Sequence, residues 1–507
     1  MPELETLLRD ARPDWPEPST GAEARARAAL GLGPAPRSPR GWLARTARAR
    51  GTRLLIPAAL LLTAGAAVAA TLIGTSSSGA PVGSPASLDF GPPETVGGPV
   101  SLIDGLPAVA VDGRGVVTVV WGRAGRIVVS SRAPTGGWSA PERVSDPARR
   151  AAYPRVGTDR DGDVTVVWRE RIAATRVTQR FTLPSGAPAG YLTELTGQRW
   201  AVVARSRPVG GAWSPPRRLS GETASVRDME APGLVVMPDG RAVVTWDVAG
   251  SVWSRGRPPG GDWSAAERVG GDGGEAVDPQ LTGPPSGGAV LTWSNRIATG
   301  TDRRYAIRAA VQGTDGTWGD AAVIDDAAVN PPHAAPALGR DGDAAVAWIS
   351  ESMDRTETSA SVRSPGGSWS AAALVDTTPR LFGLRGAPAI DGDGRAVVLS
   401  GPRGAASVRG DDGMWRPLPL SPIAGRAFGL AAFADAAGGV IVVRGASAPS
   451  HLVVERATGA GGPVRVAASA ASTAPVAAAG PDGTTALAWA RSGPSSAAVV
   501  AVAEPPR

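Results

Sequence analysis

Residues 132–144 read RAPTGGWSAPERV, and this stretch decides the fold because its key positions recur in register along the chain. The pattern consists of an arginine, a glycine, a tryptophan and a final aliphatic residue, here Arg132, Gly136, Trp138 and Val144. Such repetition is typical of folds built from repeated supersecondary units. The other copies are Arg207/Gly211/Trp213/Leu219, Arg257/Gly261/Trp263/Val269, Arg363/Gly367/Trp369/Val375, the arginine-free Gln312/Gly316/Trp318/Ile324 and the shorter Arg409/Gly413/Trp415.

A second motif is a glycine turn followed by a short apolar strand that ends, in most copies, with tryptophan. Successive turn glycines lie 44 to 78 residues apart, and most of these spacings are close to the ~40–50 residues of a four-stranded propeller blade. The copies are Gly115 to Trp121, Gly162 to Trp168, Gly240 to Trp246, Gly287 to Trp293, Gly342 to Trp348, Gly483 to Trp489, and the degenerate Gly394 to Ser400 and Gly438 to Arg444.

Each unit divides into four strands, which in the first unit are Pro107–Val111, Val116–Trp121, Arg126–Arg132 and Trp138–Val144. The eighth unit has three such strands, ending with Ala497–Val502, and no fourth. The missing strand is found at the other end of the body, where residues 90–96 repeat the pattern of residues 138–144 with Phe90 in the tryptophan position. The sequence therefore predicts an all-β, eight-bladed propeller closed by an N-terminal strand, with seven blades as the alternative.

The composition limits the chemistry that is available. The chain has no cysteine, which excludes disulfides and thiolate ligands, and its cations are all arginine, a bias we attribute to a GC-rich bacterial genome. Of the net charge of +6, residues 1–53 supply +4, so the repeat body is close to neutral and nucleic-acid binding is disfavoured. His333 and His451 lack metal-ligand spacing and no phosphate-binding loop occurs, so we expect no metal and no cofactor.

An uncharged run of 21 residues, Leu54–Gly74, is long enough to cross a bilayer as a helix. Six arginines lie within residues 37–53, and the next charged residue after the run is Asp89, so the positive-inside rule places the N-terminus in the cytoplasm. A cleaved signal peptide with a small-residue site at residues 68–70 is the alternative, but its apolar region would be unusually long. The sequence predicts a single-pass cell-membrane protein with its C-terminal body outside.

The predicted domains are a basic cytoplasmic tail (1–53) with short helices, the transmembrane helix (54–74), a Ser/Gly/Pro-rich linker (75–87) and the extracytoplasmic propeller (88–507). Residues 1–35 could be a docking peptide for a cytosolic partner. The other interpretation, which their small apolar surface favours, is a solvated tail.

Two sets of loops distinguish the faces of the predicted propeller. Loops from strand 1 to 2 and from strand 3 to 4 are short and form what we call the short-loop face; the remaining connections carry the insertions 169–199, 294–304 and 349–358 and form the long-loop face. Binding residues are common on long loops held by a rigid scaffold, so the long-loop face is the candidate functional surface. Its candidate ligand-binding residues, which ordinary solvated loop charge would also explain, are Arg169, Glu170, Arg171, Asp247, Asn295, Arg296 and Glu351.

Other repeated residues have structural explanations. Most tryptophans occupy the two motif positions, which predicts packing between blades, and the motif arginine is expected to lie against the ring or to pair with a carboxylate. The acidic segments at Asp159–Asp163 and Asp391–Gly394 resemble calcium loops, but a tight hairpin uses the same residues, and we favour the turn.

The tryptophan hairpins and Asp-Gly turns resemble those of the sialidase/BNR-like propellers and of tryptophan-repeat propeller lectins, over some 420 residues. The resemblance implies a propeller with a glycan-directed surface. The Asp-box of sialidases, S-x-D-x-G-x-x-W, is absent, and no arginine triad can be placed beside Tyr153, Tyr191 or Tyr305, so no catalytic residue is transferred.

Three functions follow as hypotheses. The first is a non-catalytic ligand-binding or sensing propeller displayed outside the cell, with a glycan or an envelope protein on its long-loop face. The second is a membrane-tethered, sialidase-like exo-glycosidase. The third is a scaffold for an envelope protein complex.

Overall fold

The computed structural model describes residues 89–505, with gaps that fall mostly in connections between strands. The predicted tail (1–53), membrane span (54–74) and linker (75–87) therefore lie outside the described residues, together with residues 1–35 as a docking peptide. Among the described residues, no helix has the length and apolar character needed to cross a membrane. The gaps are 183–187, 223–230, 272–274, 284–287, 298–303, 330–332, 353, 380–385, 424–426, 448–449, 458–463, 467–472, 474 and 492–495.

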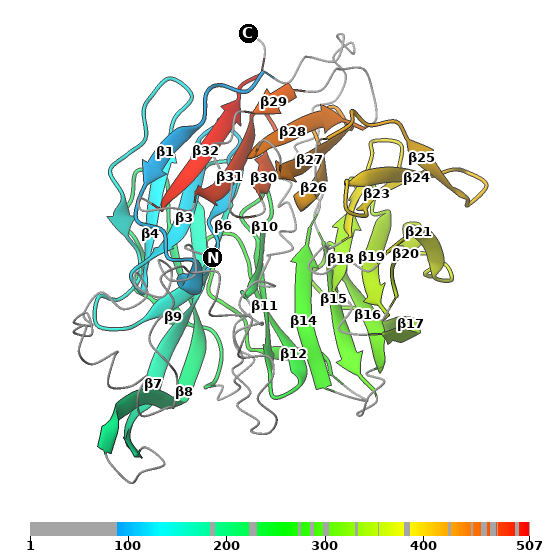
Figure 1. Ribbon diagram of the computed structural model, residues 1–507. Helices are drawn as coiled ribbons and strands as arrows, with labels where there is room; N and C mark the ends of the chain where they lie inside the picture. Colours follow the sequence, from blue (N-terminus) through cyan, green and yellow to red (C-terminus); the bar gives the residue numbers. More distant parts are fainter. Residues whose placement is uncertain are drawn as a thin grey trace, which may run out of the picture. The chain divides into compact units, whose positions relative to one another are not determined.

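The described residues form eight four-stranded antiparallel sheets, which confirms the prediction of eight blades. Innermost strands of consecutive blades contact one another from β2 round to β30 and back to β2, so the blades close into a ring (Figure 1). The innermost strands are β2 (Ala108–Val111), β6 (Ala151–Thr158), β10 (Gly233–Val236), β14 (Glu275–Thr282), β18 (Ala334–Leu338), β22 (Ala387–Ile390), β26 (Ala427–Ala434) and β30 (Val476–Ala479). The one-turn helix η3 (Leu102–Asp104) precedes β2.

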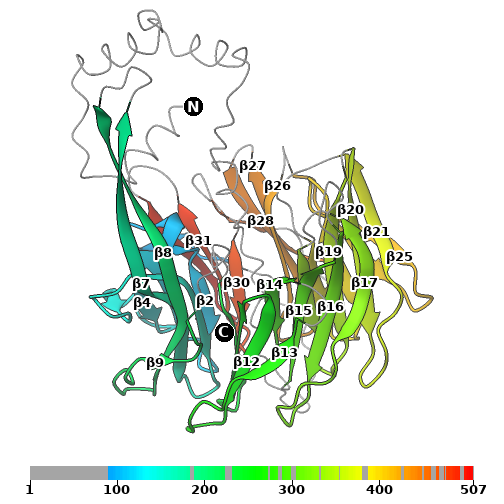
Figure 2. The same ribbon diagram turned by 90° about the horizontal axis from the view of Figure 1, so that it is seen from below.

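The remaining strands follow in chain order within each blade (Figure 2). The second strands are β3 (Val117–Arg123), β7 (Val164–Thr182), β11 (Ala242–Val248), β15 (Ala289–Arg296), β19 (Ala344–Glu351), β23 (Ala396–Ser400), β27 (Val440–Ser447) and β31 (Thr485–Arg491). The third strands are β4 (Arg126–Arg132), β8 (Pro188–Arg207), β12 (Ser251–Arg257), β16 (Arg304–Gln312), β20 (Arg355–Arg363), β24 (Ala405–Arg409), β28 (Ser450–Arg456) and β32 (Ala497–Ala503). The outer strands are β5 (Glu142–Arg143), β9 (Arg217–Arg218), β13 (Glu267–Gly270), β17 (Ala322–Val329), β21 (Ala373–Pro379), β25 (Trp415–Leu418), β29 (Val464–Val466) and, in blade 8, β1 (Glu94–Gly97).

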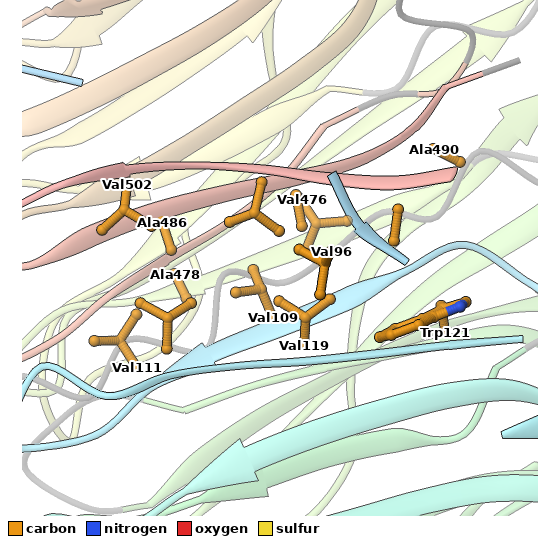
Figure 3. Packing of buried hydrophobic residues seen from close by; sticks show 14 of the residues in the cluster. Val96, Val109, Val111, Val119, Trp121, Val476, Ala478, Ala486, Ala490 and Val502 are labelled. Atoms are coloured by element: carbon orange, nitrogen blue, oxygen red, sulfur yellow. The ribbon is translucent and has the colours of Figure 1, made fainter. Parts of the chain in front are cut away.

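Strand β1 completes blade 8, as the sequence predicted. It pairs antiparallel with β32, Glu94 opposite Val500 and Thr95 opposite Val499, and Phe90 forms a bridge with Ala503. Val96 is 6% exposed and packs in one cluster with residues of blades 8 and 1, including Trp121 (Figure 3). Closure therefore buries apolar surface from both ends of the propeller. Burial of apolar surface is the main source of folding free energy.

The second-strand tryptophans form the layer between neighbouring blades. Six of them are at most 2% exposed: Trp121, Trp168, Trp246, Trp293, Trp348 and Trp489. For Trp121 and Trp293, glycine in the preceding blade provides room, since a Cβ on Gly97 would lie 2.7 Å from Cζ2 of Trp121 and one on Gly270 would also collide with the ring of Trp293. The prediction of inter-blade packing is confirmed for these rings.

Three motif arginines, Arg132, Arg207 and Arg257, lie against a motif tryptophan or pair with a carboxylate, which confirms that prediction for them. The guanidinium carbon of Arg207 lies 4.7 Å from the ring centre of Trp213, and the corresponding distance from Arg257 to Trp263 is 5.2 Å. Arg132 instead forms an ion pair with Glu504 at 3.3 Å. These contacts hold the hairpin between the third and outer strands.

The acidic segments on the short-loop face are hairpin turns. Oδ1 of Asp159 accepts hydrogen bonds from the amides of Gly162 and Asp163, both at 2.8 Å, and Gly162 has a φ of +90°. The equivalent oxygen of Asp391 accepts from the amides of Asp393 and Arg395. The carboxylates are thus used by their own turns, as expected of an Asx turn.

We expect Asp159→Asn to stabilise the protein at pH 7. Burial raises the pKa of Asp159, the nearby Asp163 and Asp161 add to the rise, and the turn amides oppose it. Because the folded-state pKa lies above the unfolded value, the folded state binds more protons, and stability falls as the pH rises through that interval. Asparagine keeps the oxygen that accepts the two amide hydrogen bonds but has no charge to bury.

The measurement is chemical unfolding at several pH values. The stability advantage of Asp159→Asn should grow from pH 3 to pH 7. Asp239→Asn, at a half-exposed turn carboxylate, controls for the loss of one charge. A constant difference between Asp159→Asn and the native chain across this pH range would contradict the prediction.

Two expectations about loops were wrong. Residues 169–199 were expected to form an inserted loop, but β7 and β8 continue through most of that segment. The described residues of their distal part, 176–182 and 188–196, belong to a compact unit distinct from the propeller. Likewise, the fourth strand was expected to give way to a loop at the final aliphatic residue of the motif, but β17 continues past Ile324 to Val329 and β21 past Val375 to Pro379.

Candidate functional site

The seven candidate ligand-binding residues lie within second strands rather than in loops, near the middle of β7 in blade 2 and at the strand ends in blades 3, 4 and 5. Arg169, Glu170 and Arg171 belong to β7, Asp247 to β11, Asn295 and Arg296 to β15, and Glu351 to β19. Arg169, Glu170, Asp247 and Asn295 are buried, so these four are not solvated loop charges. Whether any of the seven contacts a ligand stays a prediction.

Arg169 and Asp247 form an ion pair between blades 2 and 3. Nη2 of Arg169 lies 2.7 Å from Oδ1 of Asp247, and the arginine side chain is 1% exposed. A guanidinium this deeply buried needs a charged partner, because removing the charge from water is costly. The pair therefore ties two blades together beneath the long-loop face.

Glu170 and Arg171 lie beside the chain that enters blade 2. Oε1 of Glu170 is 3.6 Å from Nη1 of Arg149, and burial raises the pKa of Glu170 while Arg149 opposes the rise. Burial also lowers the pKa of Arg171, and the neighbouring charge of Arg150 adds to this effect. Arg150 itself pairs with the buried Asp104 at 2.7 Å.

The other candidates lie in blades 4 and 5. Arg296 forms an ion pair with Glu275, on the adjacent innermost strand, and Asn295 is fully buried beside it. Glu351 is half-buried at the end of β19, opposite Thr356 on β20. An ion pair thus joins Arg169 to Asp247, whereas Arg296 is held by Glu275, a residue outside the predicted set.

The innermost strands of blades 2 and 4 carry a feature that the sequence analysis missed. Tyr153 in β6 and Asp278 in β14 have φ angles of +57° and +53°, and the strand register shifts at both positions. For a residue with a side chain, this left-handed backbone conformation costs of order 1–3 kcal/mol of free energy. The conformation persists where the surrounding structure enforces it, often at functional sites. A bulge re-aims the side chain that it carries.

Asp278 is joined to His333, which precedes β18 in the next blade. Oδ2 of Asp278 contacts Nδ1 of His333, and Oδ1 accepts a hydrogen bond from Nε2 of Gln280 at 2.7 Å. The aspartate side chain is 7% exposed and that of the histidine is 30% exposed, so the accessible part of this pair is the imidazole. A carboxylate on Nδ1 fixes the ring and directs Nε2 to an outside partner.

Tyr153 occupies the corresponding bulge in blade 2. Burial, followed by the charge of Asp104, raises the pKa of Tyr153 to about 12, although Arg169 and Arg150 oppose the rise. The phenol is therefore protonated at physiological pH and can donate a hydrogen bond. It is poorly suited to act as a nucleophile, which requires a lowered pKa or an adjacent base.

One sequence signal could have found both bulges. Proline follows each residue, as Pro154 and Pro279, inside a stretch that otherwise has the pattern of an innermost strand. Proline cannot donate a hydrogen bond to the ladder and within a sheet marks an edge or a bulge. His333 carried no such signal, because its partner lies 55 positions away.

The described residues thus define an eight-bladed β-propeller with polar side chains at the long-loop end of its innermost strands. No family model and no curated protein matches the chain. Among solved structures, it is similar to an ulvan lyase from a new polysaccharide lyase family, at 12% identity and a TM-score of 0.41, covering 75% of this chain and 97% of that one.

Two further solved structures are similar to the chain at a comparably low identity. A protein of unknown function from Dyadobacter fermentans has 11% identity and a TM-score of 0.38, with 71% of this chain and 96% of that chain covered. NanB sialidase from Streptococcus pneumoniae has 10% identity and a TM-score of 0.35, with 62% and 65% covered. The resemblance to sialidase-like propellers concerns the fold alone, and the fold rests on the eight sheets themselves.

Proposed function

We propose that this protein is a single-pass membrane protein that displays its propeller outside the cell as a ligand-binding module. The apolar run 54–74 and the arginines before it support the anchor and the orientation. The long-loop face is the binding surface in this proposal, because the Asx-turn carboxylates of the opposite face serve their own turns.

The observation that carries the proposal is the pair of strained bulges at Tyr153 and Asp278. Both lie at the same end of innermost strands, and both place a polar side chain where an apolar strand would otherwise continue. A protonated phenol donates, whereas a neutral imidazole held through Nδ1 accepts at Nε2. An aromatic ring combined with hydrogen-bonding groups of both kinds suits a glycan.

The residues predicted from sequence then have two different roles. Arg169 and Asp247 hold the blades beneath the site through their ion pair. Arg171, Arg296 and Glu351 are half-buried and stay candidates for ligand contact. An envelope protein as the ligand on this face, and a cytosolic partner for residues 1–35, are further proposals that pull-down from membranes would test.

One observation favours the second function, a membrane-tethered exo-glycosidase of the sialidase-like kind. Burial raises the pKa of Glu170, and a general acid in glycoside hydrolysis requires such a shift. A tyrosine nucleophile at residue 153 is disfavoured, because its pKa is raised to about 12. We therefore rank ligand binding first.

We expect His333→Gln and Asp278→Asn each to weaken glycan binding by about tenfold or more, which corresponds to ~1.4 kcal/mol. Asparagine tolerates a positive φ, so Asp278→Asn preserves the bulge while weakening the hold on His333. The measurement is a glycan array with the full-length chain, followed by titration with the glycan that binds.

His451→Gln, in β28, is the matched control and should bind as the native chain does. Unchanged binding by both site variants would place the ligand elsewhere. If the native chain binds no glycan but hydrolyses aryl glycosides, and Glu170→Gln abolishes that hydrolysis, the glycosidase is the function.

A further inference from the structure

The outer strands of blades 4 and 5 differ from those of the other six blades. β17 has 8 residues and β21 has 7, whereas the outer strands of the other blades have 2 to 4. An outer strand leaves one row of backbone N–H and C=O groups without a neighbouring strand, and proteins commonly shorten such edges to prevent pairing with another chain. In Figures 1 and 2, β17 and β21 lie on the outer side of neighbouring blades.

The exposed arginines that protect the edges of blades 1 to 3 are missing from these two strands. Five residues after the motif tryptophan, blades 1, 2 and 3 carry the exposed arginines Arg143, Arg218 and Arg268. At the same position, blades 4 and 5 carry Val323 and Leu374, which are 51% and 58% exposed. Charged residues on an edge strand oppose strand addition, so their replacement by large apolar residues leaves both edges open to it.

We propose that β17 and β21 are docking edges for an extended segment of another protein, which adds to the sheets as a further antiparallel strand. Main-chain hydrogen bonds supply affinity in this mode of recognition, and alternate side chains supply specificity. This surface is separate from the long-loop face, so the inference goes beyond the proposed ligand-binding function.

The charge of the edges indicates the chemistry of the partner. The two strands carry Asp325, Asp326 and Asp376 and no basic residue, and Asp326 is exposed. Directly opposed charges of opposite sign stabilise a strand pair by roughly 0.2–1 kcal/mol. The partner segment therefore carries apolar residues, which cover Val323 or Leu374, and basic residues, which attract the aspartates.

A second copy of this chain fits the edge poorly. Two β17 strands paired antiparallel about their centres would place Asp325 of each copy opposite Asp326 of the other. Because neighbouring side chains point to opposite faces, each face of the joined sheet would carry one pair of opposed carboxylates, and like charges directly opposed are destabilising. Charge thus favours a basic partner strand over self-association.

The test uses a fluorescent peptide in which lysine and valine alternate. It measures the binding of this peptide to the full-length chain in detergent. We expect saturable binding that weakens about tenfold or more in the double variant Val323→Arg/Leu374→Arg, which restores the residue type of blades 1 to 3. Met414→Arg is the matched control, because Met414 is 63% exposed in the β24–β25 turn, and it should bind normally.

A second peptide of equal charge with a central proline distinguishes strand addition from simple attraction, since proline cannot join the ladder. It should bind at least about tenfold more weakly than the alternating peptide. Equal binding of the two peptides, or equal binding by the native and double-variant chains, would overturn the proposal. Self-association of the native chain that the double variant abolishes would also overturn it, in favour of a dimer edge.

Discussion

A chain that lacks residues 89–97 is expected to lose its folded propeller and to aggregate. The deletion removes β1, whose Val96 is buried and whose residues pair with β32. Burying one valine contributes about 1.5–3 kcal/mol, and each hydrogen bond contributes roughly 1 kcal/mol net. Losing the strand thus removes a large share of the ~5–15 kcal/mol that stabilises a typical domain.

Aggregation follows from what the deletion exposes. β32 reads AAVVAVA and is buried along its length, so without β1 it becomes an apolar edge. Thermal unfolding and size-exclusion chromatography measure the two effects. A deletion of equal length in the predicted linker, residues 75–83, is the control and should leave both unchanged; an intact monomer lacking β1 would show that closure is dispensable.

The second large effect is expected at the buried ion pair of blades 2 and 3. Asp247→Ala leaves the guanidinium of Arg169, whose side chain is 1% exposed, without its carboxylate. Breaking such a pair from one side costs about 3–5 kcal/mol, whereas replacing both partners by apolar residues is often neutral. We expect the double variant Arg169→Met/Asp247→Leu to recover most of the stability that Asp247→Ala loses.

Denaturant unfolding of Arg169→Met, Asp247→Leu and their double variant gives the coupling energy of the pair. Additive losses would show that the two side chains do not act together. Glycan binding by the stable double variant shows whether the two side chains contact the ligand or only support the blades. Retained binding assigns both residues to the scaffold, and lost binding assigns them to the ligand site.

The sequence was sufficient to predict the propeller fold because the same turn and packing residues recur in most blades. Glycine turns, buried tryptophans and the copy of the outer strand at Phe90 gave the number of blades and the closure. These features are local patterns of period two with fixed turns, which a single chain displays directly.

The site was less accessible to prediction, because its contacts join residues that are distant in sequence. Charged residues after the tryptophans were expected in loops. Arg169 instead lies within the sheet, where it pairs with Asp247, 78 positions away. The strain at Tyr153 and Asp278 is a property of backbone angles and was visible only as a proline in an unexpected place. The length of the outer strands in blades 4 and 5 was underestimated, because no turn signal marks where β17 ends.

Closure by β1 also imposes an order on folding. Val100 and Ser496, which are joined by two hydrogen bonds, lie 396 positions apart, so contacts of this kind wait until nearly the whole chain has been synthesised. Contacts between distant segments form slowly, because the entropy of closing the intervening chain must be overcome first. The earliest propeller strand to emerge from the ribosome is thus among the last to find its partner, and β1 stays unpaired in a nascent chain until blade 8 has been synthesised.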